Sequence, residues 1–145
     1  MDDEGFRQLV ATTARNKDSH YYYTAELDAR VVSASLSDRT AVIEFIAGTA
    51  EICSSNCLDE GLVGTIADYW TSTLITAVNG GRGAVTTTLS VQALRAVEPG
   101  TRIHVICTAT EPDSRPMPYA TARFVSAQDH GDVLALATHT KFFKR

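Results

Sequence analysis

The sequence lacks the features that mark several special classes of protein. Its net charge is only −4 over 145 residues and no run of like charges occurs, so nothing indicates binding to nucleic acid or to an anionic membrane. The longest uninterrupted apolar stretches are far too short to cross a bilayer. No repeat, low-complexity segment or domain boundary is visible. These absences predict one globular domain, residues 1–145, that is large enough to bury its own core.

Cysteine is scarce, with three residues in the chain, and an odd number does not form a disulfide framework. The start of the chain is acidic (Met1-Asp2-Asp3-Glu4), unlike a secretory leader or an Arg-rich transit peptide, so we expect reduced thiols and a cytoplasmic protein. No second Cys/His pair joins Cys53 and Cys57 at zinc-like spacing, so we expect neither a metal nor another cofactor. A Cys nucleophile paired with His104, His130 or His139 stays open, although no nucleophile elbow surrounds either thiol.

The apolar residues of the middle segment recur at helical spacing. They occupy every fourth position from Leu62 to Val78, and Asn79-Gly80-Gly81 provides a stop. Asp59 is suited to be the N-cap of this helix, and Glu60 follows it in the first turn, where a carboxylate complements the helix dipole. The pattern predicts a helix of about five turns.

Other segments alternate apolar and polar residues with a period of two. In 84–94, Val85, Leu89 and Val91 alternate with Thr86 and its polar neighbours. We expect a short helix over 2–15 and strands over 22–35, 39–48, 84–94, 103–109, 119–125 and 133–142. Because the connections are short, the last four strands are expected to form an antiparallel meander. The fold class is therefore α+β, with the long helix against one face of the sheet.

This order of elements, together with Leu58, Gly61 and Leu62 ahead of an acid at Asp68, resembles the hotdog-fold thioesterases. Within that superfamily the chain is most similar to the acyl-CoA thioesterase branch that includes the phenylacetyl-CoA thioesterases. The segment 91–100 and the ending 138–141 (Thr-His-Thr-Lys) are also family-like. The resemblance covers about 24–142, which leaves 1–20 as an N-terminal helix or extension. It implies a long central helix wrapped by a curved antiparallel sheet of about six strands, and a homodimer or a dimer of dimers.

The resemblance also implies roles for particular residues. The family has His-Gly-Gly at the helix start, an acid about two turns later, and a Ser or Thr on the next strand. Asp68 occupies the acid position, as general base or nucleophile, and Thr86 occupies the water-positioning hydroxyl position. The backbone N–H groups of Glu60 and Gly61 would form the oxyanion site. Asp59-Glu60 stands where the family has His-Gly, and carboxylates there would compete with or repel an oxyanion.

The residue types agree with this chemistry. Thioester hydrolysis needs an activated water or a nucleophile, and donors aimed at the developing oxyanion. A carboxylate among apolar helix residues could be partly desolvated, which would raise its pKa toward useful basicity. The plainer interpretations are a solvated helix residue for Asp68, an N-cap alone for Asp59, and β-propensity for Thr86.

Substrate-binding candidates come from the same comparison. The family places an Asn or Gln in the loop before the helix, and strict spacing puts Cys53 there, whereas Asn56 requires a loop adjustment. Arg82 and Arg95 could meet the phosphates of coenzyme A or of a carrier-protein arm. Each arginine taken singly is also consistent with a surface charge.

The leading hypothesis is therefore an enzyme that hydrolyses acyl thioesters, with an acyl-CoA or an acyl carrier protein conjugate as its substrate. One alternative is acid/base chemistry by Asp59, Glu60 and Asp68 (dehydration, cyclisation or proton transfer) on a polyketide-like substrate in secondary metabolism. A second alternative is a non-catalytic hotdog protein that binds an acyl ligand.

Overall fold

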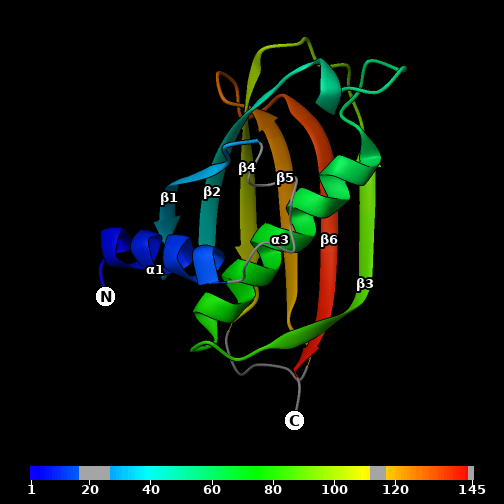
Figure 1. The fold of residues 1–145 in the computed structure, drawn as a ribbon. Helices are drawn as coiled ribbons and strands as arrows, with labels where there is room; N and C mark the ends of the chain where they lie inside the picture. The colour runs from blue at the N-terminus through cyan, green and yellow to red at the C-terminus, as the bar shows by residue number, and fades with distance from the viewer. Residues whose placement is uncertain (17–26, 112–116, 144–145) are drawn as a thin grey trace.

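The computed structural model describes residues 1–16, 27–111 and 117–143 (Figure 1). Two helices and six strands make up these ranges, together with a short 3-10 helix at Thr49–Glu51. The helices are α1 (Asp3–Asn16) and α3 (Glu60–Val78). The strands are β1 (Arg30–Ser35), β2 (Thr40–Ala47), β3 (Ala84–Ala93), β4 (Thr101–Ala109), β5 (Tyr119–Ser126) and β6 (Val133–Phe143). The α+β class and the six strands are as predicted.

The first strand is shorter than expected. It was predicted over 22–35 but begins at Arg30, because Leu27 and Asp28 form a turn in which Asp28 has φ of +51°. That left-handed conformation cannot continue an extended strand. The part of the prediction over 22–26 lies outside the described residues.

All six strands form one antiparallel sheet in the order β1-β2-β4-β5-β6-β3. The meander prediction is right for β4, β5 and β6 but wrong for β3, which pairs with β6 and not with β4. The connection from β3 to β4 is held at the end of the sheet, where Val97 N donates to Asn56 O and Gly100 N donates to Ala47 O, both at 2.7 Å. Strand β4 therefore enters the sheet beside β2, and β3 becomes an edge.

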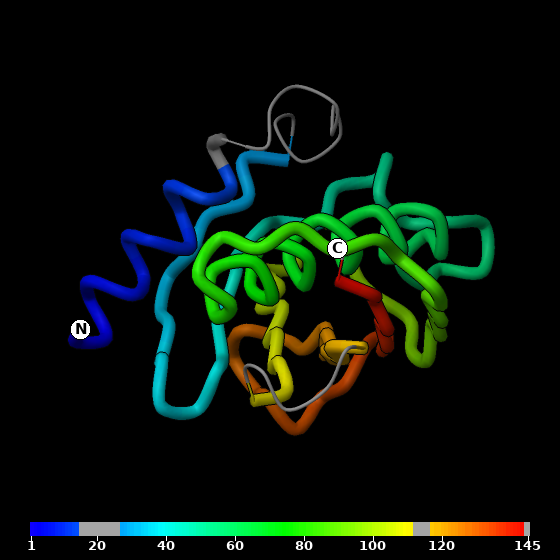
Figure 2. Tube along the Cα trace, turned by 90° about the horizontal axis from the view of Figure 1, so that it is seen from below, coloured from blue at the N-terminus to red at the C-terminus, as the bar shows by residue number. Residues whose placement is uncertain are grey.

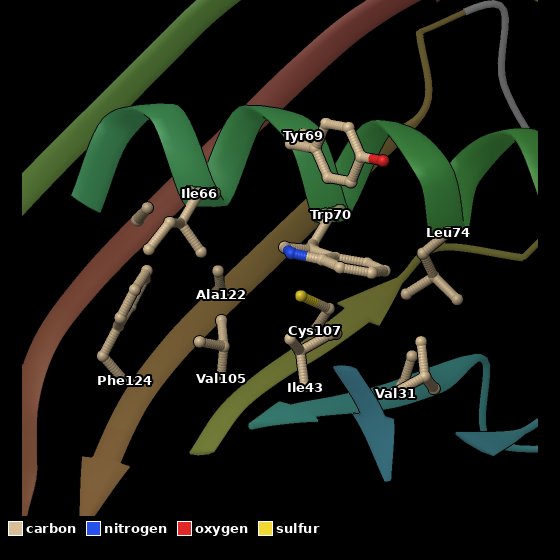
Figure 3. Packing of buried hydrophobic residues seen from close by; sticks show 14 of the residues in the cluster. Val31, Ile43, Ile66, Tyr69, Trp70, Leu74, Val105, Cys107, Ala122 and Phe124 are labelled. Carbon is tan, nitrogen blue, oxygen red and sulfur yellow. The ribbon is translucent and has the colours of Figure 1, made fainter. Parts of the chain in front are cut away.

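The core lies between α3 and the concave face of the sheet, which curves beneath the helix (Figure 2). Inward-facing residues of β2 and β4 alternate regularly with outward-facing ones, as period-two strands require. Trp70 from α3 lies over Cys107 of β4, with Ile66 and Leu74 on either side of it (Figure 3). Burial raises the pKa of the Cys107 thiol to about 12, so this cysteine is a core residue without useful nucleophilicity.

The two edges of the sheet differ. At one edge, α1 packs against β1 and buries Phe6 and Val10 (Figure 1). At the other edge, β3 has no fully buried residue along its ten positions in the single chain. Neither helix in the described parts of the chain has the length and hydropathy needed to span a membrane.

Candidate functional site

A cluster of polar side chains interrupts the apolar layer between α3, β6 and β3. Helix α3 contributes Asp68, Thr71 and Ser72, which share one face because they are three and four positions apart. Strand β6 contributes His139 and Lys141, and β3 contributes Thr86. We call these six residues the polar cluster. It joins two residues predicted for the site, Asp68 and Thr86, through side chains that were not assigned to it.

His139 is the centre of the polar cluster and is 0% exposed. Its Nε2 lies 2.7 Å from Thr86 Oγ1 and 3.7 Å from Asp68 Oδ1. Its Nδ1 lies 2.7 Å from Thr71 Oγ1. The two candidate functional side chains, Asp68 and Thr86, therefore approach the same ring nitrogen from different elements.

A β-bulge turns Thr86 toward this cluster. Thr86 pairs with Lys141 whereas Thr88 pairs with Thr140, so Thr87 is the extra residue. Without the bulge, the alternation that runs back from Leu89 would place Thr86 on the outer face of the sheet. With it, Thr86 shares the inner face with Lys141, and Val85 points outward, 44% exposed. Bulges often re-aim a side chain beside an active site.

Lys141 supplies a buried positive charge to the cluster. It is 7% exposed, and its Nζ donates to Ser72 Oγ at 2.7 Å. The Ser72 hydroxyl donates in turn to Asp68 Oδ1 at 3.3 Å. Since a buried ammonium is costly unless it is paired, this relay to the carboxylate accounts for its position. Asp68 is 29% exposed, so one side of it is anchored while the other faces solvent.

The helix start lies two turns away from the polar cluster. Asp59 is the N-cap, as expected, and its Oδ2 accepts from Leu62 N at 3.0 Å. The exposed Glu60 and Gly61 hold the remaining first-turn N–H groups. From Gly61 to Asp68 the helix rises about 10 Å at 1.5 Å per residue. Asp59, Glu60 and Asp68 therefore do not form one acid cluster within a single chain, and the acid/base alternative gains no support from their geometry.

A pocket of about 490 Å³ adjoins the helix start. From α3 and its N-cap, the pocket is lined by Asp59, Gly61, Leu62 and Thr65. The segments before the helix contribute Leu27, Ala50 and Glu51. Thr65 is one helical turn before Asp68, so the pocket and the polar cluster occupy neighbouring parts of the same helix surface.

The four residues predicted to bind substrate lie at several places. Cys53 and Asn56 belong to the tight loop before α3, where Cys53 N donates to Cys57 O and Asn56 has φ of +65°. A hydrogen bond to Ser55 lowers the pKa of the Cys53 thiol. Arg82 lies just before β3, 4.3 Å above the Phe143 ring, and Arg95 lies just after β3 in an ion pair with Asp132.

The other two candidate histidines lie away from the polar cluster. His104 Nδ1 is 2.9 Å from His130 Nε2, and His104 Nε2 is 2.9 Å from Glu44. Hydrogen bonds from His104 and Arg30 lower the pKa of Glu44 to about 2. Across the ranges that the structure covers, no three His, Cys, Asp or Glu side chains come together in a way that could hold a metal ion.

His139 and Lys141 were the main residues missed as parts of the site. The signal was present, because the period-two pattern of β6 places Ala135, Ala137, His139 and Lys141 on one face. A histidine and a lysine continuing a buried face require polar partners there.

The whole chain resembles solved structures of thioesterases. A zebra fish thioesterase superfamily member 2 superposes with a TM-score of 0.77 at 19% sequence identity, over 99% of each chain. The chain therefore has the hotdog fold. A putative thioesterase of Ralstonia eutropha, described as a phenylacetic acid degradation-related protein, shares this hotdog fold with a TM-score of 0.71 and 18% identity, over 92% of this chain and 98% of that chain. A Streptococcus mutans protein solved with acetyl-CoA bound superposes with a TM-score of 0.63 at 15% sequence identity, over 74% of this chain and 82% of that chain.

No family model and no curated protein matches the sequence itself. At these identities the likeness to the solved hotdog structures establishes the fold, and the reaction has to be argued from the site.

Proposed function

We propose that this hotdog protein hydrolyses acyl thioesters, carried by coenzyme A or by an acyl carrier protein, with Asp68 as the general base. The observation that carries the proposal is the approach of Asp68 and Thr86 to one nitrogen of His139 beside an open sheet edge. The carboxylate is anchored through Ser72 and Lys141 but partly exposed, as a group that meets substrate must be. The hotdog fold and the acetyl-CoA bound to one similar structure agree with this substrate class.

The reaction would use one water molecule. The water oxygen bonds to the thioester carbon while one of its protons passes to Asp68. The tetrahedral intermediate then collapses, the C–S bond breaks with its electron pair on sulfur, and the proton on Asp68 passes to the leaving thiolate. The products are a carboxylic acid and a free thiol. An Asp68 nucleophile, attacking the carbonyl carbon directly, is the variant of this mechanism that the same geometry allows.

The site would be completed by a second copy of the chain. The backbone donors at Glu60 and Gly61 lie about 10 Å along the helix from Asp68. At that distance the donors and the Asp68 carboxylate of one chain cannot act on the same carbonyl group. The free edge of β3 carries ten residues without a charged side chain or proline, and it can pair with the same strand of another copy. A homodimer, alone or within a dimer of dimers, would in this way bring a second helix start to the exposed side of Asp68.

The test is thiol release from acyl-CoAs with short, long and aromatic acyl groups, measured with a thiol reagent. Asp68→Asn is expected to lower kcat by roughly two to four orders of magnitude, the usual contribution of a general base. Asp38→Asn, in the exposed turn between β1 and β2, is the matched control and should leave kcat unchanged. Undiminished turnover in Asp68→Asn would disprove the assignment.

The alternatives give other outcomes of the same panel. Activity on a free polyketide without turnover of any acyl-CoA would favour acid/base chemistry. Tight binding of acyl-CoA without turnover, unaffected by replacing Asp59, Glu60 and Asp68, would identify a binding protein.

A further inference from the structure

The hydrogen-bond partners of His139 determine how the Thr86 hydroxyl is oriented. We propose that His139 is a positioning residue which holds the proton of Thr86 inward, so that Thr86 Oγ1 accepts a hydrogen bond from the attacking water. This inference rests on the proposed hydrolysis of thioesters and assigns a further residue to the same site.

The first step concerns Thr71, because its hydroxyl has one proton to donate. Thr71 Oγ1 donates that proton to Ala67 O at 2.5 Å, one helical turn back. Toward His139 Nδ1, at 2.7 Å, the same oxygen can therefore act only as an acceptor. Nδ1 must carry a hydrogen, and in a neutral imidazole this leaves Nε2 as an acceptor.

The second step concerns Thr86. When the ring is neutral, Nε2 accepts, and the contact of 2.7 Å then has Thr86 Oγ1 as its donor. The distance from Nε2 to Asp68 Oδ1, 3.7 Å, is too long for a hydrogen bond that would compete with it. With its proton committed to a ring that is 0% exposed, Thr86 presents only oxygen lone pairs toward the edge of the sheet.

The third step concerns the water. A water molecule between Thr86 Oγ1 and Asp68 would donate one hydrogen to each of them, and its own lone pair would then be directed away from both. That is the orientation which a water needs in order to attack a carbonyl carbon. The three side chains would in this way position the water before substrate arrives.

Protonation of His139 would reverse this arrangement. Nε2 would then carry a hydrogen and donate to Thr86 or to Asp68, and the hydroxyl of Thr86 would no longer be committed inward. In the described part of the chain, Asp68 from α3 lies against the ring and Lys141 lies two residues along on the same face of β6. The strand neighbours of His139, Leu89 and Ala120, are uncharged. Turnover should therefore fall on the acid side of the pH profile as His139 gains its proton.

The experiment is a double-mutant cycle on kcat for an acyl-CoA that the wild-type protein hydrolyses. His139→Asn keeps an amide near the Nδ1 position and removes the acceptor at Nε2, and Thr86→Val removes the hydroxyl without changing the shape of the side chain. We expect His139→Asn to lower kcat about tenfold to a hundredfold, with a much smaller change in KM. In the Thr86→Val background the same substitution should cost less than about threefold, because the residue acts through Thr86. Equal losses in both backgrounds would overturn the proposal.

Two further variants separate positioning from packing. His139→Gln places an amide oxygen near the Nε2 position, so it should recover part of kcat, and the acid limb of its pH profile should then reflect Asp68 alone. His130→Asn, in an exposed turn, should leave both kcat and the profile unchanged. An acid limb in His139→Gln with the same midpoint and steepness as in the wild-type protein would contradict the role of His139.

The tautomer gives a readout that needs no turnover. Nitrogen NMR of the wild-type protein near neutral pH should show His139 with its hydrogen on Nδ1, and a hydrogen on Nε2 instead would refute the inference even if the variants fail to fold. A wild-type protein that hydrolyses no thioester would contradict the proposed function, whereas the wrong tautomer would contradict this step alone.

Discussion

Thr71→Val tests the buried contact on which the orientation of His139 depends. Valine keeps the shape of threonine but cannot accept the hydrogen of Nδ1, which lies in a ring that is 0% exposed. Leaving a buried donor without a partner costs about 1–3 kcal/mol. The substitution also removes the hydrogen bond from Thr71 to Ala67 O. A control variant that loses only this kind of hydrogen bond is therefore needed.

Thr73→Val supplies that reference. Thr73 is also buried in α3, and its hydroxyl donates to Tyr69 O at 2.7 Å in the same back-bonding geometry. Among the described residues it has no hydrogen bond to a histidine, so its replacement should cost about 1 kcal/mol or less. We expect Thr71→Val to be less stable than Thr73→Val by about 1–2 kcal/mol.

The assay is urea unfolding of both variants beside the wild-type protein, with the slope m checked for constancy. In thermal unfolding the same difference corresponds to roughly 2–4 °C for each kcal/mol at this chain length. Equal stability of the two valine variants would show that the Nδ1 hydrogen does not depend on Thr71, and the assigned tautomer would then lose its basis.

Two further predictions concern carboxylates outside the polar cluster. The pKa of Glu44 is lowered from 4.5 to about 2 in the folded protein. Its contribution to stability is therefore complete above pH 4.5 and is lost as the pH falls toward 2. In acid unfolding, Glu44→Gln should lose less stability than the wild-type protein across this pH range. Asp59→Ala should lower the free energy of unfolding by about 1 kcal/mol, because the N-cap of α3 is lost. Asp59→Asn keeps a capping side chain and should lower it by only a few tenths of a kcal/mol. A fall in kcat for Asp59→Asn would show that the carboxylate does more than cap α3.

The helices and strands could be predicted from the sequence because they depend on local patterns. The spacing from Leu62 to Val78 needs no knowledge of the rest of the chain, and α3 covers the predicted segment. The place of β3 in the sheet could not be predicted in this way, since pairing with β6 is a long-range choice that no local pattern encodes. The predicted meander failed at that strand.

The candidate site shows the same division. Asp68 and Thr86 were selected because their positions in the chain resemble a family motif, and the structure brings them to one histidine. Period-two spacing counted back from Leu89 would by itself put Thr86 on the outer face, and nothing in a run of three threonines shows which one will be the bulge. The pairing of Thr86 with Lys141 depends on hydrogen bonds to another strand, so only the folded structure reveals it.

The unequal edges of the sheet have a consequence for assembly. A sheet with two open edges can add copies at both ends and grow into a fibre. Here α1 packs against β1 at one edge, and the ten uncharged residues of β3 form the other. Association through one edge is self-limiting. In the described part of the chain, α1 packs against the edge strand β1 and leaves β3 as the open edge, so two molecules joined along β3 have no further open edge to offer. Removing α1 would therefore be expected to expose the edge at β1 as well, so that copies could add at both ends of the sheet.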